Sequence, residues 1–147
     1  MTLHCELCQF DYTRALWQND KFFIIAVQDE KFPGYVRLIW KEHVAEMTDL
    51  EAQDRLMIWK ALDIIETCMR KHMHPDKINL AEFGNMVPHL HWHIIPRYTD
   101  DSHFPESIWG LQQRKLSVNT TQRQALANTF YKELKEVLQE QLEGTGR

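Results

Sequence analysis

Three histidines alternate with large apolar residues in the segment Val87-Pro-His-Leu-His-Trp-His-Ile-Ile-Pro-Arg97. Because side chains on a β-strand alternate between its two faces, His89, His91 and His93 are predicted to share one face. The residues predicted to share the other face and to pack on a helix are Leu90, Trp92 and Ile94. Three imidazoles are poor core material, since each has two ring nitrogens that need partners. The histidine side of this strand is therefore predicted to meet something polar or anionic.

Two kinds of chemistry suit such a row of imidazoles. One is metal binding, since a neutral imidazole is the commonest metal ligand. The other is covalent catalysis at phosphorus, because a neutral imidazole is a good nucleophile near neutral pH and water can attack the resulting phosphohistidine. A third alternative is a solvent-facing strand that happens to be rich in histidine, which the demanding His-x-His-x-His pattern disfavours.

Apolar runs predict the strands that must position these histidines. The predicted strands cover residues 22–27, 35–40, 77–83 and 88–98. The first two would form a hairpin, with a turn at Pro33-Gly34.

Helical spacing of apolar residues predicts two helices. The first would begin at Thr48, with Glu51 completing a capping box, and would end before Pro75. The last helix would begin at Thr120. The predicted fold class is therefore α+β: a mostly antiparallel sheet of about five strands, one long helix packed on it, and a C-terminal helix.

The composition bounds the class of protein. The chain has 147 residues, 44% hydrophobic and 26% charged, which predicts one globular domain over residues 1–118 with residues 119–147 as its helical extension. A net charge of −4 argues against a broad surface for nucleic acid. No apolar run approaches the roughly 20 residues of a membrane span, and Met1–Glu6 does not resemble a secretory signal. We therefore expect a cytoplasmic protein, in which three cysteines form no disulfide framework.

The histidine segment, with Gly84 five positions before His89, resembles the signature of the histidine triad (HIT) family. The resemblance covers about residues 3 to 98. It includes the stretch Gly34–His43, the Cys5-x-x-Cys8 pair and the strand residues Ile78-Asn79-Leu80. It implies a HIT-like fold for residues 1–118 and an activity like that of a diadenosine tetraphosphate hydrolase.

The resemblance also implies residue roles. His91 would attack the α-phosphorus of a dinucleoside polyphosphate or a nucleoside phosphoramidate, and water would release the nucleotidyl group. His93 would hydrogen-bond the phosphate oxygens and help the leaving group to depart. The other substrate contacts implied are Asn79, Asn85, Val87 and, at the ribose, Asp29. Met86 stands where the family often has a small hydroxyl donor, which leaves a nucleotide-binding module with little turnover as an alternative. The resemblance also implies a nucleotidyl transferase as a second enzyme alternative.

Cys5-x-x-Cys8 is short enough to chelate one ion. The resemblance adds His43 and His89 as the remaining ligands, so a structural Cys2His2 zinc site is predicted, with two free thiols as the alternative. No organic cofactor is expected.

The sequence also predicts the environment of four further residues and the assembly. Arg97 would either neutralise phosphate or form a salt bridge, and Trp109 would either approach the nucleotide or pack ordinarily. His103 is predicted at the surface, with a position that reaches the site as the alternative, and Cys68 is predicted in the core. The resemblance implies a homodimer that forms through the main helix and the strand before the triad.

Overall fold

The computed structural model describes residues 5–142 of the chain. Residues 1–4, at the start of the predicted domain of residues 1–118, lie outside the described residues. So do residues 143–147, at the end of the predicted extension of residues 119–147. The core of the fold is a five-stranded sheet in the order β1-β2-β3-β5-β4, in which all neighbours are antiparallel. Its strands are β1 (Trp17–Gln18), β2 (Phe22–Ala26), β3 (Val36–Trp40), β4 (Lys77–Ala81) and β5 (His91–Arg97). The predicted α+β class and the hairpin of its second and third strands are confirmed.

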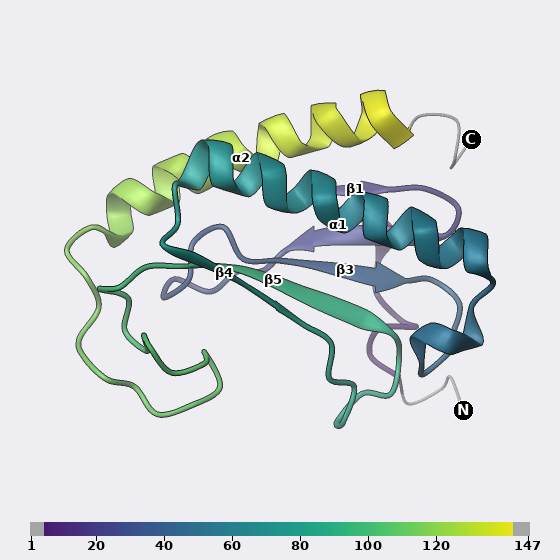
Figure 1. Cartoon of the computed structure of the whole chain (residues 1–147), viewed down its shortest axis with the longest axis horizontal. Helices are drawn as coiled ribbons and strands as arrows, with labels where there is room; N and C mark the ends of the chain where they lie inside the picture. The colour runs from purple at the N-terminus through teal and green to yellow at the C-terminus, as the bar shows by residue number, and fades with distance from the viewer. Residues whose placement is uncertain (1–4, 143–147) are drawn as a thin grey trace.

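Both long helices lie on the same side of the sheet (Figure 1). They are α1 (Ala52–Met73) and α2 (Thr120–Leu142). α2 packs against α1, and the indole Nε1 of Trp17 donates to Gln139 of α2 at 3.1 Å. Neither helix, within the described residues, is long and apolar enough to cross a membrane.

The predicted start of the first helix is wrong. α1 begins at Ala52, whereas Thr48 lies in a separate 3-10 turn, η2 (Met47–Asp49). The backbone N–H of Glu46 donates to the Asp49 carboxylate at 3.0 Å, so the capping interaction forms before η2. Leu50 and Glu51 have extended backbone, and Leu50 is buried in the core. A helix capped at Thr48 would need helical backbone at Leu50. The extended backbone there instead accompanies a Leu50 side chain that is buried in the core.

The pairing of β3 with β5 assigns each residue of these strands to a face of the sheet. Leu38 lies opposite Trp92 on the face covered by the helices, where the second predicted set, Leu90, Trp92 and Ile94, is buried in the core with α1. On the other face Ile39 lies opposite His91 and Arg37 lies opposite His93. We call this second face, which carries Ile39, Arg37, His91 and His93, the histidine face.

The turn between β2 and β3 requires a glycine. Gly34 has a φ of +92°, which L side chains rarely adopt. A Cβ there would also lie 2.9 Å from the Met73 side chain and 3.0 Å from Pro96. The absence of a side chain thus lets the end of α1 and the end of β5 pack against the hairpin.

Candidate active site and metal centre

His91 is held in the tautomer that a nucleophile needs. Its Nδ1–H donates to the carbonyl oxygen of His89 at 2.6 Å, and a carbonyl can only accept, so the proton lies on Nδ1. The lone pair is then on Nε2. Burial is the main cause that lowers the pKa of His91, and the charge of Arg37 adds to it. The ring is therefore neutral and its Nε2 is available to attack an electrophile.

His93 is bonded in a different way. Its Nδ1 lies 2.6 Å from the hydroxyl of Tyr35, and that hydroxyl oxygen accepts from Arg37 Nε at 3.3 Å. Burial raises the pKa of Tyr35, so the hydroxyl keeps its proton and can donate it to His93 Nδ1. This arrangement favours a His93 that carries its own proton on Nε2. Burial, followed by the charge of Arg37, lowers the pKa of His93 to about 3, so the free ring is neutral.

Tyr35 and Arg37 are site residues that the sequence did not single out. Both reach the histidines through the β3–β5 pairing, in which Arg37 is the direct neighbour of His93. Tyr35 and Arg37 are two positions apart in extended chain, so the sequence alone predicts that they share a face. The register that sets this face beside His93 depends on contacts between residues far apart in sequence, which the sequence does not reveal.

Two half-exposed aromatic side chains stand beside His93. The Trp109 ring lies edge-on to His93 and to Phe83, with ring centroids 4.9 Å apart in both pairs. Phe83 and Trp109 remain 55% and 49% exposed, respectively. The structure therefore brings Trp109, whose role the sequence left open, from the segment after β5 to the edge of the histidine site.

The four predicted metal ligands converge. The ligand atoms of Cys5, Cys8, His43 and His89 all lie within 4.8 Å of one another. The Sγ atoms of Cys5 and Cys8 lie 3.4 and 3.3 Å from His89 Nδ1, and the two histidine Nδ1 atoms are 3.2 Å apart. A tetrahedral zinc with bonds of about 2.0–2.3 Å separates its ligand atoms by about 3.3–3.7 Å. This group could hold one metal ion, and its spacing fits zinc.

His89 is also oriented for that role. Its Nε2–H donates to the carbonyl oxygen of Trp40 at 2.5 Å, which leaves the lone pair on Nδ1, the atom that faces the cysteines. A carbonyl partner on the far nitrogen is how proteins commonly fix a metal-binding histidine. His89 lies just before β5 rather than within it, so the predicted strand start at residue 88 is too early.

The other predicted substrate contacts are less closely joined to the histidines. Asn85 is exposed and Val87 half-buried in the loop between β4 and β5, where the carbonyl of Val87 accepts from His89 N at 2.8 Å. Asp29 accepts from Lys31 N at 3.0 Å beside a cavity of about 340 Å³ that also borders α2. Within residues 5–142, no hydrogen bond or ion pair joins Asp29, Asn85 or Val87 to His91 or His93.

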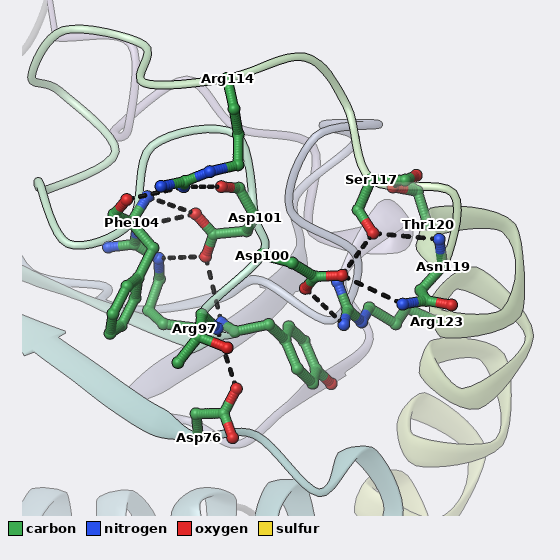
Figure 2. A network of polar contacts seen from close by, with 12 residues as sticks. Asp76, Arg97, Asp100, Asp101, Phe104, Arg114, Ser117, Asn119, Thr120 and Arg123 are labelled. Carbon is green, nitrogen blue, oxygen red and sulfur yellow. Dashed lines mark hydrogen bonds and ion pairs between the residues drawn. The ribbon is translucent and has the colours of Figure 1, made fainter.

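Arg97 forms a salt bridge within the fold (Figure 2). Its Nε and Nη2 donate to the two carboxylate oxygens of Asp101 at 2.8 and 3.0 Å, and both side chains are at least 96% buried. Nη1 donates to the side-chain oxygen of Asn79 at 2.8 Å. This settles the two alternatives for Arg97 in favour of the salt bridge, and it ties the amide of Asn79 to Arg97.

His103 is buried rather than at the surface, so that prediction is wrong. Its Nδ1 lies 2.8 Å from Ser102 Oγ, and its backbone N–H donates to Asp101. In the tight turn around the Asp101 carboxylate, the His103 ring packs edge-on against the Phe32 ring, with centroids 5.3 Å apart. Cys68 is buried in the core, as predicted, and burial raises the pKa of its thiol to about 11.

Comparison with known proteins identifies the class of protein. The family model described as the HIT domain matches residues 11–100, which is more than half of the chain. The chain therefore belongs to the HIT domain family, and the resemblance seen in the sequence is confirmed.

Two curated relatives share part of this chain. One is a bis(5'-adenosyl)-triphosphatase from Saccharomyces cerevisiae strain YJM789, 36% identical over 72 residues, which cover 45% of this chain and 35% of the relative. The other is an AP-4-A phosphorylase from Mycobacterium tuberculosis strain H37Rv, 31% identical over 84 residues, which cover 53% and 43%. The match thus spans less than half of the length of each relative.

Solved structures share the fold. A histidine triad protein from Marinobacter aquaeolei VT8 is 26% identical, with a TM-score of 0.68 over 84% of this chain and 89% of that one. A Zn-bound histidine triad family protein from Mycobacterium smegmatis is 16% identical, with a TM-score of 0.57 over 93% and 99%.

Proposed function

We propose that this protein hydrolyses nucleoside phosphates, with dinucleoside polyphosphates such as diadenosine tetraphosphate as the leading substrate class. The observation that carries the proposal is the opposite bonding of two adjacent histidines. His91 keeps a lone pair on Nε2, while the partners of His93 favour a proton on its Nε2. One ring can attack phosphorus while its neighbour donates a hydrogen bond to the departing oxygen. The two named relatives act on diadenosine compounds by their names, which supports the same substrate class here.

In the first step, His91 Nε2 forms a bond to the α-phosphorus, and the bond from that phosphorus to the bridging oxygen breaks. The electron pair leaves with the oxygen, which accepts a hydrogen bond from His93 Nε2–H. The result is a nucleotidyl-histidine and a free leaving phosphate.

In the second step, water forms a bond to the same phosphorus and the phosphorus–nitrogen bond breaks, which restores His91. The attacking water loses its proton to bulk solvent, while His93 Nε2–H hydrogen-bonds the oxygens of the nucleotide. The product is a nucleoside monophosphate, and both histidines return to their starting states.

The test is turnover of diadenosine tetraphosphate and adenosine phosphoramidate by the wild type and by His91→Ala. We expect the substitution to reduce turnover by at least about 10³-fold, because a nucleophile is removed. His72→Ala, at the end of α1, is the matched control and should retain activity. An acid-labile nucleotidyl adduct should be trapped on the wild type alone. Turnover that survives His91→Ala would contradict the assignment, and binding without turnover by the wild type would favour a nucleotide-binding module.

Transfer to phosphate instead of water is a second candidate, supported by the relative named AP-4-A phosphorylase. The same adduct would then be attacked by orthophosphate. Adding orthophosphate to the reaction distinguishes the two, since a phosphorylase would release a nucleoside diphosphate where a hydrolase releases the monophosphate.

We further propose that the Cys5, Cys8, His43 and His89 group holds a structural zinc ion. The donor set, its spacing and the carbonyl partner of His89 support this identity. Such an ion would link the N-terminal segment to the strand that carries the histidines. It would take no part in the reaction at phosphorus.

A homodimer is proposed as the assembly. β4 is an edge strand of the sheet, and Leu80 on β4 and Trp59 on α1 are exposed apolar side chains. Edge strands and exposed apolar surfaces favour association. A monomeric mass in solution would contradict the homodimer.

The cytoplasmic location stays a prediction.

A further inference from the structure

Arg37 is a charged residue on the histidine face that the reaction described above does not use. Its position on β3 is directly opposite His93, whereas Ile39 is opposite His91. Arg37 is therefore on the side of His93, which hydrogen-bonds the leaving group, rather than on the side of the nucleophile His91. Its charge acts on both rings, as the lowered pKa values of His91 and His93 reflect after the larger effect of burial.

Among the described residues, only one nitrogen of the Arg37 guanidinium makes a hydrogen bond. Nε donates to the Tyr35 hydroxyl, and the group lies 5.5 Å from the centre of the Tyr35 ring. Within residues 5–142, its two terminal nitrogens make no hydrogen bond, and no carboxylate lies within 4.0 Å of them. A half-buried arginine with free terminal nitrogens beside neutral imidazoles forms a local centre of positive charge.

We propose that Arg37 binds the phosphates of the leaving group, beyond the α-phosphate, and so makes the site selective for substrates with a polyphosphate chain. This inference rests on the proposed function, because the position of the leaving group is defined by His93. A planar guanidinium offers two parallel donors to a phosphate. Bound there, Arg37 would neutralise the charge that the departing phosphate gains when its bond to the α-phosphorus breaks.

An alternative role for Arg37 is to hold the Tyr35 hydroxyl in place, without any contact with the substrate. If Arg37 acted only by holding the Tyr35 hydroxyl for His93, its loss would slow every substrate to the same extent. A contact with the leaving phosphates predicts a loss that depends on the substrate. Diadenosine tetraphosphate has such phosphates, whereas adenosine phosphoramidate leaves an amine.

The experiment compares kcat/KM for these two substrates in the wild type, Arg37→Met and Arg37→Lys. For Arg37→Met we expect a loss of about 10–100-fold with diadenosine tetraphosphate, the range for a hydrogen bond to a charged group, and less than about 3-fold with the phosphoramidate. Arg37→Lys keeps the charge and should recover part of the loss. The matched control is Arg70→Met, an exposed arginine at the end of α1, which should leave both substrates unaffected.

Equal losses on the two substrates, or no loss on either, would overturn the inference. If the wild type turned over neither substrate, the proposed function would fail, and the inference would then be judged by binding. Arg37→Met should then weaken the affinity for adenosine tetraphosphate by about 10-fold or more while changing that for adenosine monophosphate by less than about 3-fold. Equal changes for these two nucleotides, or no binding of either to the wild type, would overturn it.

Discussion

At the scale of single residues, the three histidines differ in which ring nitrogen is bonded and in the kind of atom that bonds it. His89 donates from Nε2 to a carbonyl and directs Nδ1 at the cysteines. His91 donates from Nδ1 to a carbonyl and keeps Nε2 free. His93 meets a hydroxyl at Nδ1. Identical side chains in one row thus acquire three different roles from their neighbours.

The role of Tyr35 is tested by Tyr35→Phe. The ring would stay packed against Phe32 and Ile95, but His93 would lose the hydroxyl that sets its proton on Nε2. We expect kcat with diadenosine tetraphosphate to fall by about 10-fold or more with little change in KM, because the hydrogen bond from His93 to the leaving group is impaired.

The matched control for this prediction is Tyr131→Phe, since the part-buried Tyr131 hydroxyl bonds the backbone of Gly34 and Tyr35 and does not contact the histidines. Its loss should affect stability, and kcat should stay within about 2-fold of the wild type. Equal effects of the two substitutions would show that Tyr35 acts through stability and would contradict the role in orienting His93.

Sequence periodicity was sufficient to predict which residues face the core and which face the site at His91 and His93. It could not predict the partners that decide the tautomers of His89 and His93. The hydroxyl of Tyr35 and the carbonyl of Trp40 reach the histidines through the pairing of β3 with β5 and the chain that enters it. Such pairings are set by the packing of the whole sheet, about which a single strand carries little information.

At the scale of elements, the irregular segment after β5 is organised by two adjacent aspartates (Figure 2). Asp101 pairs with Arg97 and accepts backbone N–H groups of Tyr98, His103 and Phe104. Asp100 binds Ser117 and Asn119, just before α2, and Arg123 in the first turn of α2. These contacts hold the segment that brings Trp109 to His93. The sequence showed only a polar, irregular stretch there, because such networks have no periodic pattern.

Asp101→Asn tests this network. The substitution leaves the guanidinium of Arg97 buried without its counter-charge, so we expect the free energy of unfolding to fall by about 3 kcal/mol. Urea unfolding measures it, with the exposed Asp63→Asn as the control, expected within about 0.5 kcal/mol of the wild type. A loss no larger than that of Asp63→Asn would contradict the importance of the pair.

The same pair predicts a dependence on pH. Burial alone would raise the pKa of Asp101, but the bonds from Arg97 and from backbone N–H groups outweigh it and lower the pKa. The contribution of Asp101 to stability is therefore complete above the unfolded pKa, about 4, and is lost as the pH falls through the lower folded value. Below about pH 4, the wild type should lose stability more steeply than Asp101→Asn.

At the scale of the whole molecule, the N-terminal segment is attached to the sheet at two places. Phe10 and Tyr12 pack on Phe23, with ring centroids 5.1 and 4.8 Å apart, and the Cys5–Cys8 pair meets His43 and His89. The proposed zinc would close a connection between residues that are far apart in the chain.

Elemental analysis of protein purified without chelator should find one zinc per chain. Cys8→Ser should lower that content and reduce Tm by about 5 °C or more, because metal binding to the folded state alone stabilises it. Cys68→Ser is the matched control, since Cys68 lies in the core away from the group, and it should keep its zinc. Zinc well below one per chain in the wild type would refute the site.

The pairing of β3 with β5 has a consequence for how the site can fail. A shift of one residue would turn His91 and His93 toward the helices and expose Trp92, because neighbours on a strand point to opposite faces. The alignment of the histidines is thus part of the same cooperative unit as the core. Partial opening at the edges of the molecule leaves them in place, and their alignment is lost only when the protein as a whole unfolds.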